Sequence, residues 1–366
     1  MGTLIKWELK KILHDRLVLL GLVLLLIFNV VNFCTGSVPA MTARVTDRED
    51  YVSGSAAVQL EQDLAKRYGD ILTDEVVAQM LDDLAFSEEF LARTGGVNVK
   101  YLSNNFLQRA VMTYFAEPDG RFNGLTVAEV FGGETIHLGY TAGWLATGEY
   151  MLRVMVLQSV LVVLALAPVF AGEYEGMDAL LLTARYGRTR LIWAKCMAGL
   201  GFAVGLTLLV LGLNYGAALL CFGTEGLSAS ILFAADDPYS FITQNLSCGQ
   251  LLLWQSRLAI TAVLMTAAST LALSAALSNR YMALAASAGL LFLPLVVSPS
   301  PEQPLYALWM LAPAYQLLSN HILAFGTIDL GGCTMLLAWW TLPACLFVLG
   351  AGAYLTKRFF ARHEVC

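Results

Sequence analysis

The sequence lacks the residue patterns by which most enzymes hold nucleotides, metals or nucleophiles. Across its 366 residues no glycine is followed by lysine, which excludes the Gly-x-x-x-x-Gly-Lys-Ser/Thr loop that cradles phosphates. Neither His-Glu-x-x-His nor Gly-x-Ser-x-Gly occurs, and the seven cysteines show no metal-ligand spacing. We therefore expect no catalytic residue, no cofactor and no metal, and we interpret the chain as a non-enzyme.

Charged residues are scarce as well. They make up 14% of the chain, against about 25% in soluble domains, while 57% is hydrophobic. The apolar residues fall into six runs near the length of about 20 residues that crosses a bilayer as a helix. The predicted spans are residues 17–34, 152–170, 191–213, 257–277, 281–297 and 333–355. The first run is longer than the core of a cleaved signal peptide and predicts a retained anchor.

Lysine and arginine are absent from two of the segments between spans, residues 223–250 and 298–332. Twelve of these residues lie in the short segments on the opposite side. The positive-inside rule then predicts that both termini are cytoplasmic. We expect the protein to lie in the plasma membrane. Cys221 and Cys248 bracket the first of the uncharged segments, and they either form a disulfide or remain separate thiols.

The N-terminal residues 1–16 predict a short amphipathic helix at the membrane interface. Its apolar residues share one face at helical spacing, and Lys6, Trp7, Lys10 and Lys11 accompany that face. The alternative is a plain positive flank of the first span.

Residues 35–148 form a polar insert, long enough for a small domain outside the cytoplasm. Apolar residues recur at helical steps over 53–68, 73–93 and 103–115, and no sheet is evident. Thr73 precedes two acidic residues, which is typical of a helix start. We expect a helical domain here, so the chain as a whole is predicted to be all-α.

Residues 305–325, within the longer uncharged segment, are too apolar for an ordinary loop. They follow a proline-rich stretch and predict two short helices, 305–311 and 313–325, neither of which can span a membrane. The two helices either dip part-way into the bilayer or lie flat on it.

The segment 172–195, between the second and third predicted spans, has an acidic start and a basic end. One interpretation is a helix that another protein grips on the inner face of the membrane. The other is a helix whose charges complement its own dipole and anchor it at lipid headgroups. The charged residues are Glu173, Glu175, Asp178, Arg185, Arg188, Arg190 and Lys195.

These features together resemble the membrane subunit of type-2 ABC exporters. Residues 5–13 resemble the interfacial elbow helix of that family, and residues 170–176, 180–183 and 188–190 with Lys195 resemble its coupling segment. The two short helices before the last span match its outer half-helices. The insert 35–148 is similar to the subgroup with a large outer domain after the first span.

The resemblance implies a permease that works as a homodimer or with a similar permease, in contact with membrane lipid and driven by two separate ATP-binding-cassette subunits. It implies export of an amphiphile (a peptide, lipid or drug-like molecule), and we expect no nucleic-acid partner. The implied coupling residues are Glu173, Glu175, Asp178, Arg185, Arg188 and Arg190, and the elbow residues are Lys6, Trp7, Lys10 and Lys11. The rival interpretation is a membrane sensor or scaffold whose domain 35–148 binds an outside ligand; a membrane enzyme comes third.

Overall fold

A computed structural model describes most of the chain, in two compact units. The described residues are 1–37, 42–94, 97–174, 190–234, 242–297, 306–318, 322–323, 326–330 and 332–362. Unit 1 comprises Met1–Val30, Met151–Gly212 and Gln255–Cys366, and unit 2 comprises Val31–Tyr150 and Leu213–Trp254.

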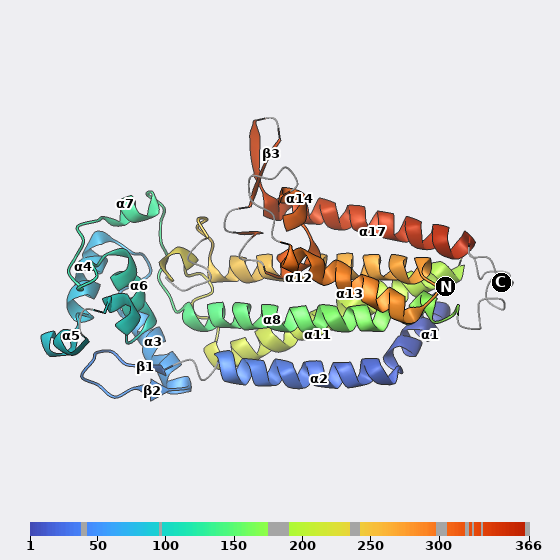
Figure 1. Cartoon of the computed structure of the whole chain (residues 1–366). Coiled ribbons are helices and arrows are strands. Elements are labelled where there is room, and N and C mark those ends of the chain that lie inside the picture. The colour runs from blue at the N-terminus through green and yellow to red at the C-terminus, as the bar shows by residue number, and fades with distance from the viewer. Residues whose placement is uncertain are drawn as a thin grey trace. The chain divides into compact units, whose positions relative to one another are not determined.

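Unit 1 is a bundle of helices. Among the described residues, five helices are long and apolar enough to cross a membrane. The prediction of a largely helical chain built for a membrane is confirmed at this level. Figure 1 shows the long helices running alongside one another. Their bounds are α2 Arg16–Asn32, which continues into a π-helical turn Phe33–Ser37; α8 Ala142–Leu166, followed by α9 Pro168–Ala171; α11 Ile192–Phe222; α12 Cys248–Ala276; and α17 Leu337–Arg362. The fifth predicted span is the shorter α13, Arg280–Val296, of 17 residues.

Close packing in the bundle depends on small residues and on buried hydrogen bonds. A Cβ at Gly352 in α17 would lie 3.0 Å from the carbonyl oxygen of Ala268 in α12, so a larger residue would require α12 to shift by a few tenths of an ångström. Between α8 and α11, the Gln158 side-chain amide donates to the Thr207 hydroxyl over 2.6 Å. Close glycine contacts and buried hydrogen bonds both suit the interior of a bilayer, where burial of apolar surface does not by itself hold helices together.

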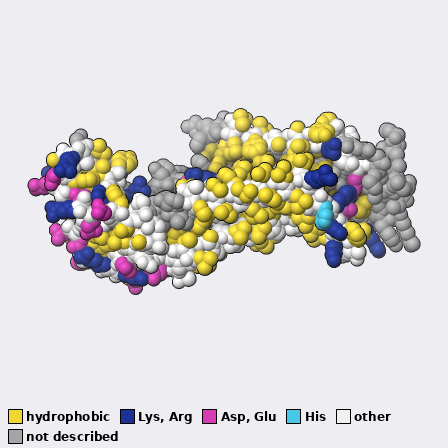
Figure 2. Space-filling view, turned by 90° about the horizontal axis from the view of Figure 1, so that it is seen from below, with side chains coloured by type: hydrophobic (Ala, Val, Ile, Leu, Met, Phe, Trp, Pro, Cys, Tyr) yellow, Lys and Arg dark blue, Asp and Glu magenta, His cyan; other side chains and the backbone are white. Residues whose placement is uncertain are grey.

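The lateral surface of the bundle is apolar. Figure 2 shows hydrophobic side chains covering the visible flank of the long helices, with Lys and Arg gathered at the end where α1, Gly2–Leu13, lies. On α2 the exposed side chains include Leu20, Val23, Leu24 and Ile27. Contiguous exposed apolar area of this kind marks contact with a membrane or a partner.

The last predicted span begins later than expected. Its first four residues, Cys333–Leu336, form strand β4, which pairs antiparallel with β3, Thr327–Leu330, so α17 starts only at Leu337. Gly332, at φ +95°, lies in the turn between the two strands. A short apolar run fits a strand as well as a helix, which is why the sequence misled here.

The predicted short helices before that span are present but smaller. They are α14, Tyr306–Met310, and α15, Pro313–Leu317. Ala312 between them is extended, as expected for a residue that precedes proline. The structure describes only Ile322 and Leu323 of the predicted remainder, 319–325, and both are helical.

Unit 2 is mainly helical, as predicted for the insert. Its helices are α3 Ser55–Arg67, α4 Asp74–Asp83, α5 Glu88–Thr94, α6 Phe106–Tyr114 and α7 Val127–Phe131 (Figure 1). Thr73 caps α4 by accepting a hydrogen bond from the Val76 N–H. The expectation that the insert contains no sheet was wrong in one place, because β1, Thr42–Ala43, pairs antiparallel with β2, Val52–Ser53. Such two-residue strands are too short to leave an alternating pattern.

Unit 2 also includes Leu213–Trp254, which contains the predicted outer segment 223–250 that the sequence treated as separate. The Trp144 indole donates to the carbonyl of Glu225 over 2.9 Å. At Gly226, with φ +82°, a Cβ would lie 1.7 Å from the carbonyl oxygen of Tyr140. Unit 2 is therefore assembled from two stretches of chain separated by 62 residues (151–212).

Candidate functional site

The predicted elbow residues lie on a real helix. In α1, Ile12 is buried and Trp7 is exposed. The Lys10 ammonium lies 5.3 Å from the centroid of the Trp7 ring. The helix is thus confirmed, and its position at a membrane interface stays a prediction.

The chain that leads into the predicted coupling loop is fastened to the end of α12. The Ser274 hydroxyl accepts hydrogen bonds from the N–H groups of Phe170 and Ala171, over 3.0 and 3.1 Å, and donates to the carbonyl of Ala167 over 2.6 Å. The Tyr174 hydroxyl donates to the carbonyl of Ala275 over 2.8 Å. One serine thus provides partners for three backbone groups near a helix end, where such groups lack intrahelical partners.

The same stretch is packed against the end of α17. The rings of Phe170 and Phe360 meet edge to face with centroids 5.1 Å apart, and Tyr174 stacks on Phe360 at 5.9 Å. Phe360 is fully buried. Such aromatic pairs contribute about 0.5–1.5 kcal/mol beyond the area they bury.

On the other side of the loop, Lys195 in the first turn of α11 is fully buried and fully paired. Its ammonium donates to Glu173 Oε1 over 2.6 Å, to Glu8 Oε2 over 3.0 Å and to the carbonyl of Val169 over 3.1 Å. An ammonium has three donors and all three are used here. Glu8 lies on α1, so this one side chain joins the elbow helix to both flanks of the loop.

Lys11 completes the arrangement from α1. Its ammonium lies 2.8 Å from Glu173 Oε1, although most of its side chain is exposed. Partial burial opposes the charge, but the hydrogen bond and the negative charge of Glu173 prevail and raise the pKa of Lys11 above its ordinary value. We call Glu8, Lys11, Glu173 and Lys195 the charge cluster. It holds two cations and two anions. Removing Lys195 would take away the cation that pairs with Glu8, and removing Glu173 would take away the carboxylate that pairs with Lys11.

The structure brings together only part of the predicted site. Glu173 is buried in the charge cluster, so its carboxylate is engaged within the chain, and Arg190 is exposed just before α11. Of the elbow residues only Lys11 belongs to the cluster. Four predicted coupling residues lie outside the described residues: Glu175, Asp178, Arg185 and Arg188.

Sequence reasoning missed two members of this site. Glu8 stands three positions before Lys11, so both lie on one side of α1, and that spacing was a usable signal. Ser274 gave no signal, because a serine within an apolar run is ordinarily bonded to its own helix.

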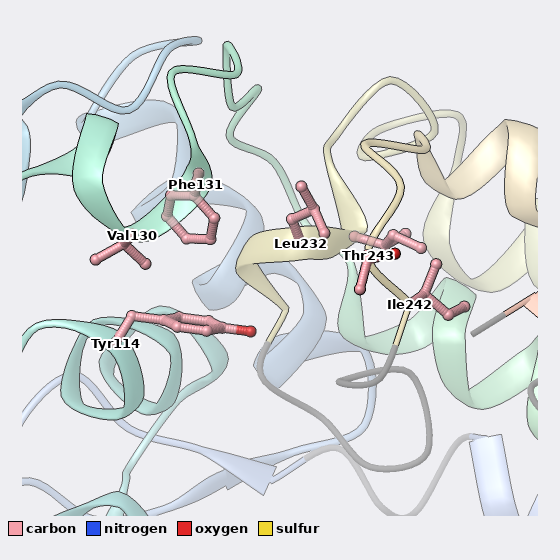
Figure 3. A pocket seen from close by; sticks show the side chains of 7 residues that line it. Tyr114, Val130, Phe131, Leu232, Ile242 and Thr243 are labelled. Atoms are coloured by element: carbon pink, nitrogen blue, oxygen red, sulfur yellow. The ribbon is translucent and has the colours of Figure 1, made fainter. Parts of the chain in front are cut away.

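Unit 2 contains a separate pocket of about 260 Å³. Figure 3 shows Tyr114 and Phe131 on one side of it and Leu232, Ile242 and Thr243 on the other. Its lining is mainly apolar. Among the described residues of the whole chain, no group of three or more His, Cys, Asp or Glu side chains could hold a metal ion.

Comparison with protein-family models, with curated proteins and with solved structures finds no match to this chain.

Proposed function

We propose that this chain is the membrane-spanning permease subunit of an ATP-binding-cassette exporter, driven by separate ATPase subunits and moving an amphiphilic substrate. The observation that carries the proposal is the fastening of both flanks of the predicted coupling loop. Glu173 before the loop and Lys195 after it are bonded to each other and to α1. Phe170 and Tyr174 are bonded to α12 and packed on α17.

This arrangement suits a loop that transmits force. A push on the loop is passed at once to α1, α11, α12 and α17, because each of these helices contacts a loop flank directly. Structural charges that merely anchored a turn at the lipid headgroups would gain nothing from burial, since burying an ion costs free energy unless it is paired. The ATPase supplies the push when it binds ATP and closes.

The proposal includes six spans with both termini in the cytoplasm. The helix α1 and the end of α17 contact the same stretch, 170–174, so they belong at one end of the bundle. An even number of crossings is needed to return the chain to that end, which supports α13 as the sixth span in this proposal. Its 17 residues extend over about 26 Å as a helix, at the short end of the range for a spanning helix.

Two variants distinguish binding of the ATPase to the loop from transmission of its movement to the helices. Reversing Glu175 and Asp178 to lysine removes loop carboxylates that we assign to the ATPase interface. Close charge pairs between proteins contribute about 1.5–7 kcal/mol, so partner binding should weaken more than tenfold. Glu173→Gln keeps the shape of its side chain but breaks up the charge cluster. It should retain the ATPase and lose export.

The measurement is copurification of an ATP-binding-cassette protein from native membranes, with export or resistance assayed in the same strain. Lys357→Gln, at an exposed lysine of α17 outside the charge cluster and the elbow helix, is the control and should preserve both readouts. The absence of any ATP-binding-cassette partner from the native complex would refute the proposal. Full export by both variants would show that the loop charges only cap the loop helix and anchor it at the lipid headgroups.

The topology has its own test. Single cysteines introduced at exposed positions in unit 2, such as Tyr101, should react with an impermeant maleimide in intact cells. Cysteines in the loop 175–189 should react only after the membrane is opened. Labelling of the loop in intact cells would contradict the prediction that the loop faces the cytoplasm.

The rival function, a sensor of outside ligands, is favoured by one observation, the apolar pocket of unit 2 (Figure 3). A sensor needs no ATPase. Copurification with a kinase in place of an ATP-binding-cassette protein would support that function.

A further inference from the structure

Unit 1 contains a cavity of about 400 Å³. Its walls come from α12, α13, the short helices α14 and α15, and α17. Pockets that bind small molecules have volumes of about 300–1,000 Å³, so this cavity falls within the usual range.

The rim of the cavity is apolar and exposed. Leu290 and Leu293 from α13 and Leu308 from α14 line it, and each is half exposed or more. None of the described side chains that line the cavity is charged. A ligand that enters here comes from an apolar medium and is uncharged, because an ion would be buried without a partner.

The deeper wall carries three hydroxyl groups, and one of them is unpaired. Ser269 donates to the carbonyl of Met265 over 2.7 Å, and Thr266 donates to the carbonyl of Ala262 over 2.9 Å. Ser287 is only 3% exposed, and its hydroxyl has no hydrogen-bond partner among the described residues. Buried hydroxyls are ordinarily bonded, so an unpaired one in a cavity wall indicates a partner that the described part of the chain does not supply.

The walls are held in place without a ligand. The Trp309 indole donates to the carbonyls of Val297 over 2.8 Å and of Pro294 over 3.3 Å, which fixes α14 against the end of α13. The Gln316 amide accepts from Thr261 over 2.6 Å and donates to the carbonyl of Leu311 over 2.7 Å, which fixes α15 against α12. A preformed cavity binds with little loss of conformational entropy.

We propose that this cavity binds a neutral, membrane-dissolved molecule with an apolar body and one hydroxyl or carbonyl group, and that Ser287 bonds that group. The apolar rim admits the body of the molecule, and the Ser287 hydroxyl donates to, or accepts from, its single polar group. Binding at equilibrium needs no ATP, so this inference holds whether or not the chain is a permease.

The test uses diazirine-bearing octanol as a photoreactive probe. The full-length protein is reconstituted in phosphatidylcholine vesicles, and labelled peptides are identified by mass spectrometry. We expect labelling around 287–294 and 308–313 that saturates and is displaced by plain octanol. Phospholipid chains are in great excess in these vesicles, so saturable labelling also shows that the site prefers the alcohol to bilayer lipid.

Three variants test the role of Ser287. Loss of one hydrogen bond in Ser287→Ala should weaken binding about fivefold. Ser287→Leu fills the cavity and should abolish saturable labelling. The matched control is Ala286→Leu, which adds the same side chain on the exposed neighbouring position of α13 and should leave labelling unchanged.

Two matched probes test the ligand chemistry. A diazirine-bearing alkane without the hydroxyl should label weakly and should not respond to Ser287→Ala. The corresponding ionised carboxylate should not label the cavity. Equal labelling by alcohol and alkane, or no effect of Ser287→Ala, would reduce the cavity to an apolar void and overturn the proposal. Equal labelling by the carboxylate would overturn the requirement for a neutral ligand.

Discussion

Lys195 and Glu8 are 187 positions apart in the sequence, yet the lysine Nζ lies 3.0 Å from the glutamate Oε2. This contact joins the first turn of α11 to α1, and Glu173 joins both to the end of α9. A fully buried ammonium with two carboxylates is costly to form and costly to disrupt.

Replacing Lys195 by methionine should destabilise unit 1 by about 3–5 kcal/mol, because two carboxylates lose their buried cation. The measurement is thermal unfolding of the protein in detergent. The control is Lys10→Met, which removes an exposed lysine whose ammonium lies over the Trp7 ring. It should lower the free energy of unfolding by at most about 1 kcal/mol. Adding Glu173→Gln to Lys195→Met should recover part of the loss, since the pair is coupled. Additive effects of the two changes would contradict the cluster.

Ser274→Ala should cost about 1–3 kcal/mol, because the N–H groups of Phe170 and Ala171 lose their acceptor in a buried setting. Ser159→Ala is the matched control, since within the described part of the chain the buried Ser159 hydroxyl bonds only the carbonyl of Met155 on its own helix. Unfolding in detergent reports both. Equal losses of unfolding free energy in the two variants would mean that Ser274, like Ser159, bonds only within its own helix.

Gly226→Ala should disrupt unit 2 far more than Gly223→Ala does. Both glycines have positive φ, at +82° and +68°, so both variants carry the strain of about 1–2 kcal/mol for a side chain in the left-handed region. Only Gly226 faces the Tyr140 carbonyl, whereas a Cβ at Gly223 meets open space. Limited proteolysis should release the segment around 226 in the first variant alone. Equal resistance of both variants would refute the contact.

Cys221 and Cys248, near the two ends of the predicted outer segment 223–250, should remain separate thiols. Cys221 is exposed and Cys248 is fully buried, and neither forms a disulfide. Maleimide should therefore modify Cys221 in the folded protein without prior reduction and leave Cys248 unmodified until denaturation. Protection of both until reductant is added would show that they pair.

The sequence predicted the helices well because their signals are local. Long apolar runs and the polar cap at Thr73 each act over a few residues, and the structure bears them out in α2, α8, α11, α12 and α4. The β3–β4 hairpin was missed because four apolar residues have no distinctive period. The start of α8 at Ala142, ten residues before the predicted span, was missed because Glu149 and Arg153 interrupt the apolar run.

The candidate site was harder to predict because its contacts are long-range. The acidic start of the loop predicts Glu173 as a docking residue, but Lys195 and the more distant Glu8 are brought to it only by tertiary folding. Likewise nothing in the run containing Ser274 indicates that its hydroxyl turns toward another helix.

The composition of unit 2 has a consequence for the order of synthesis. Residues 31–150 emerge from the ribosome first, but the carbonyl that pairs with Trp144 belongs to Glu225, beyond 62 intervening residues (151–212). At about 5–20 residues per second, the first part waits roughly 3–12 s for its complement. Until then the Trp144 indole lacks its acceptor, and a ribosome stalled before residue 213 would leave the domain without its second stretch.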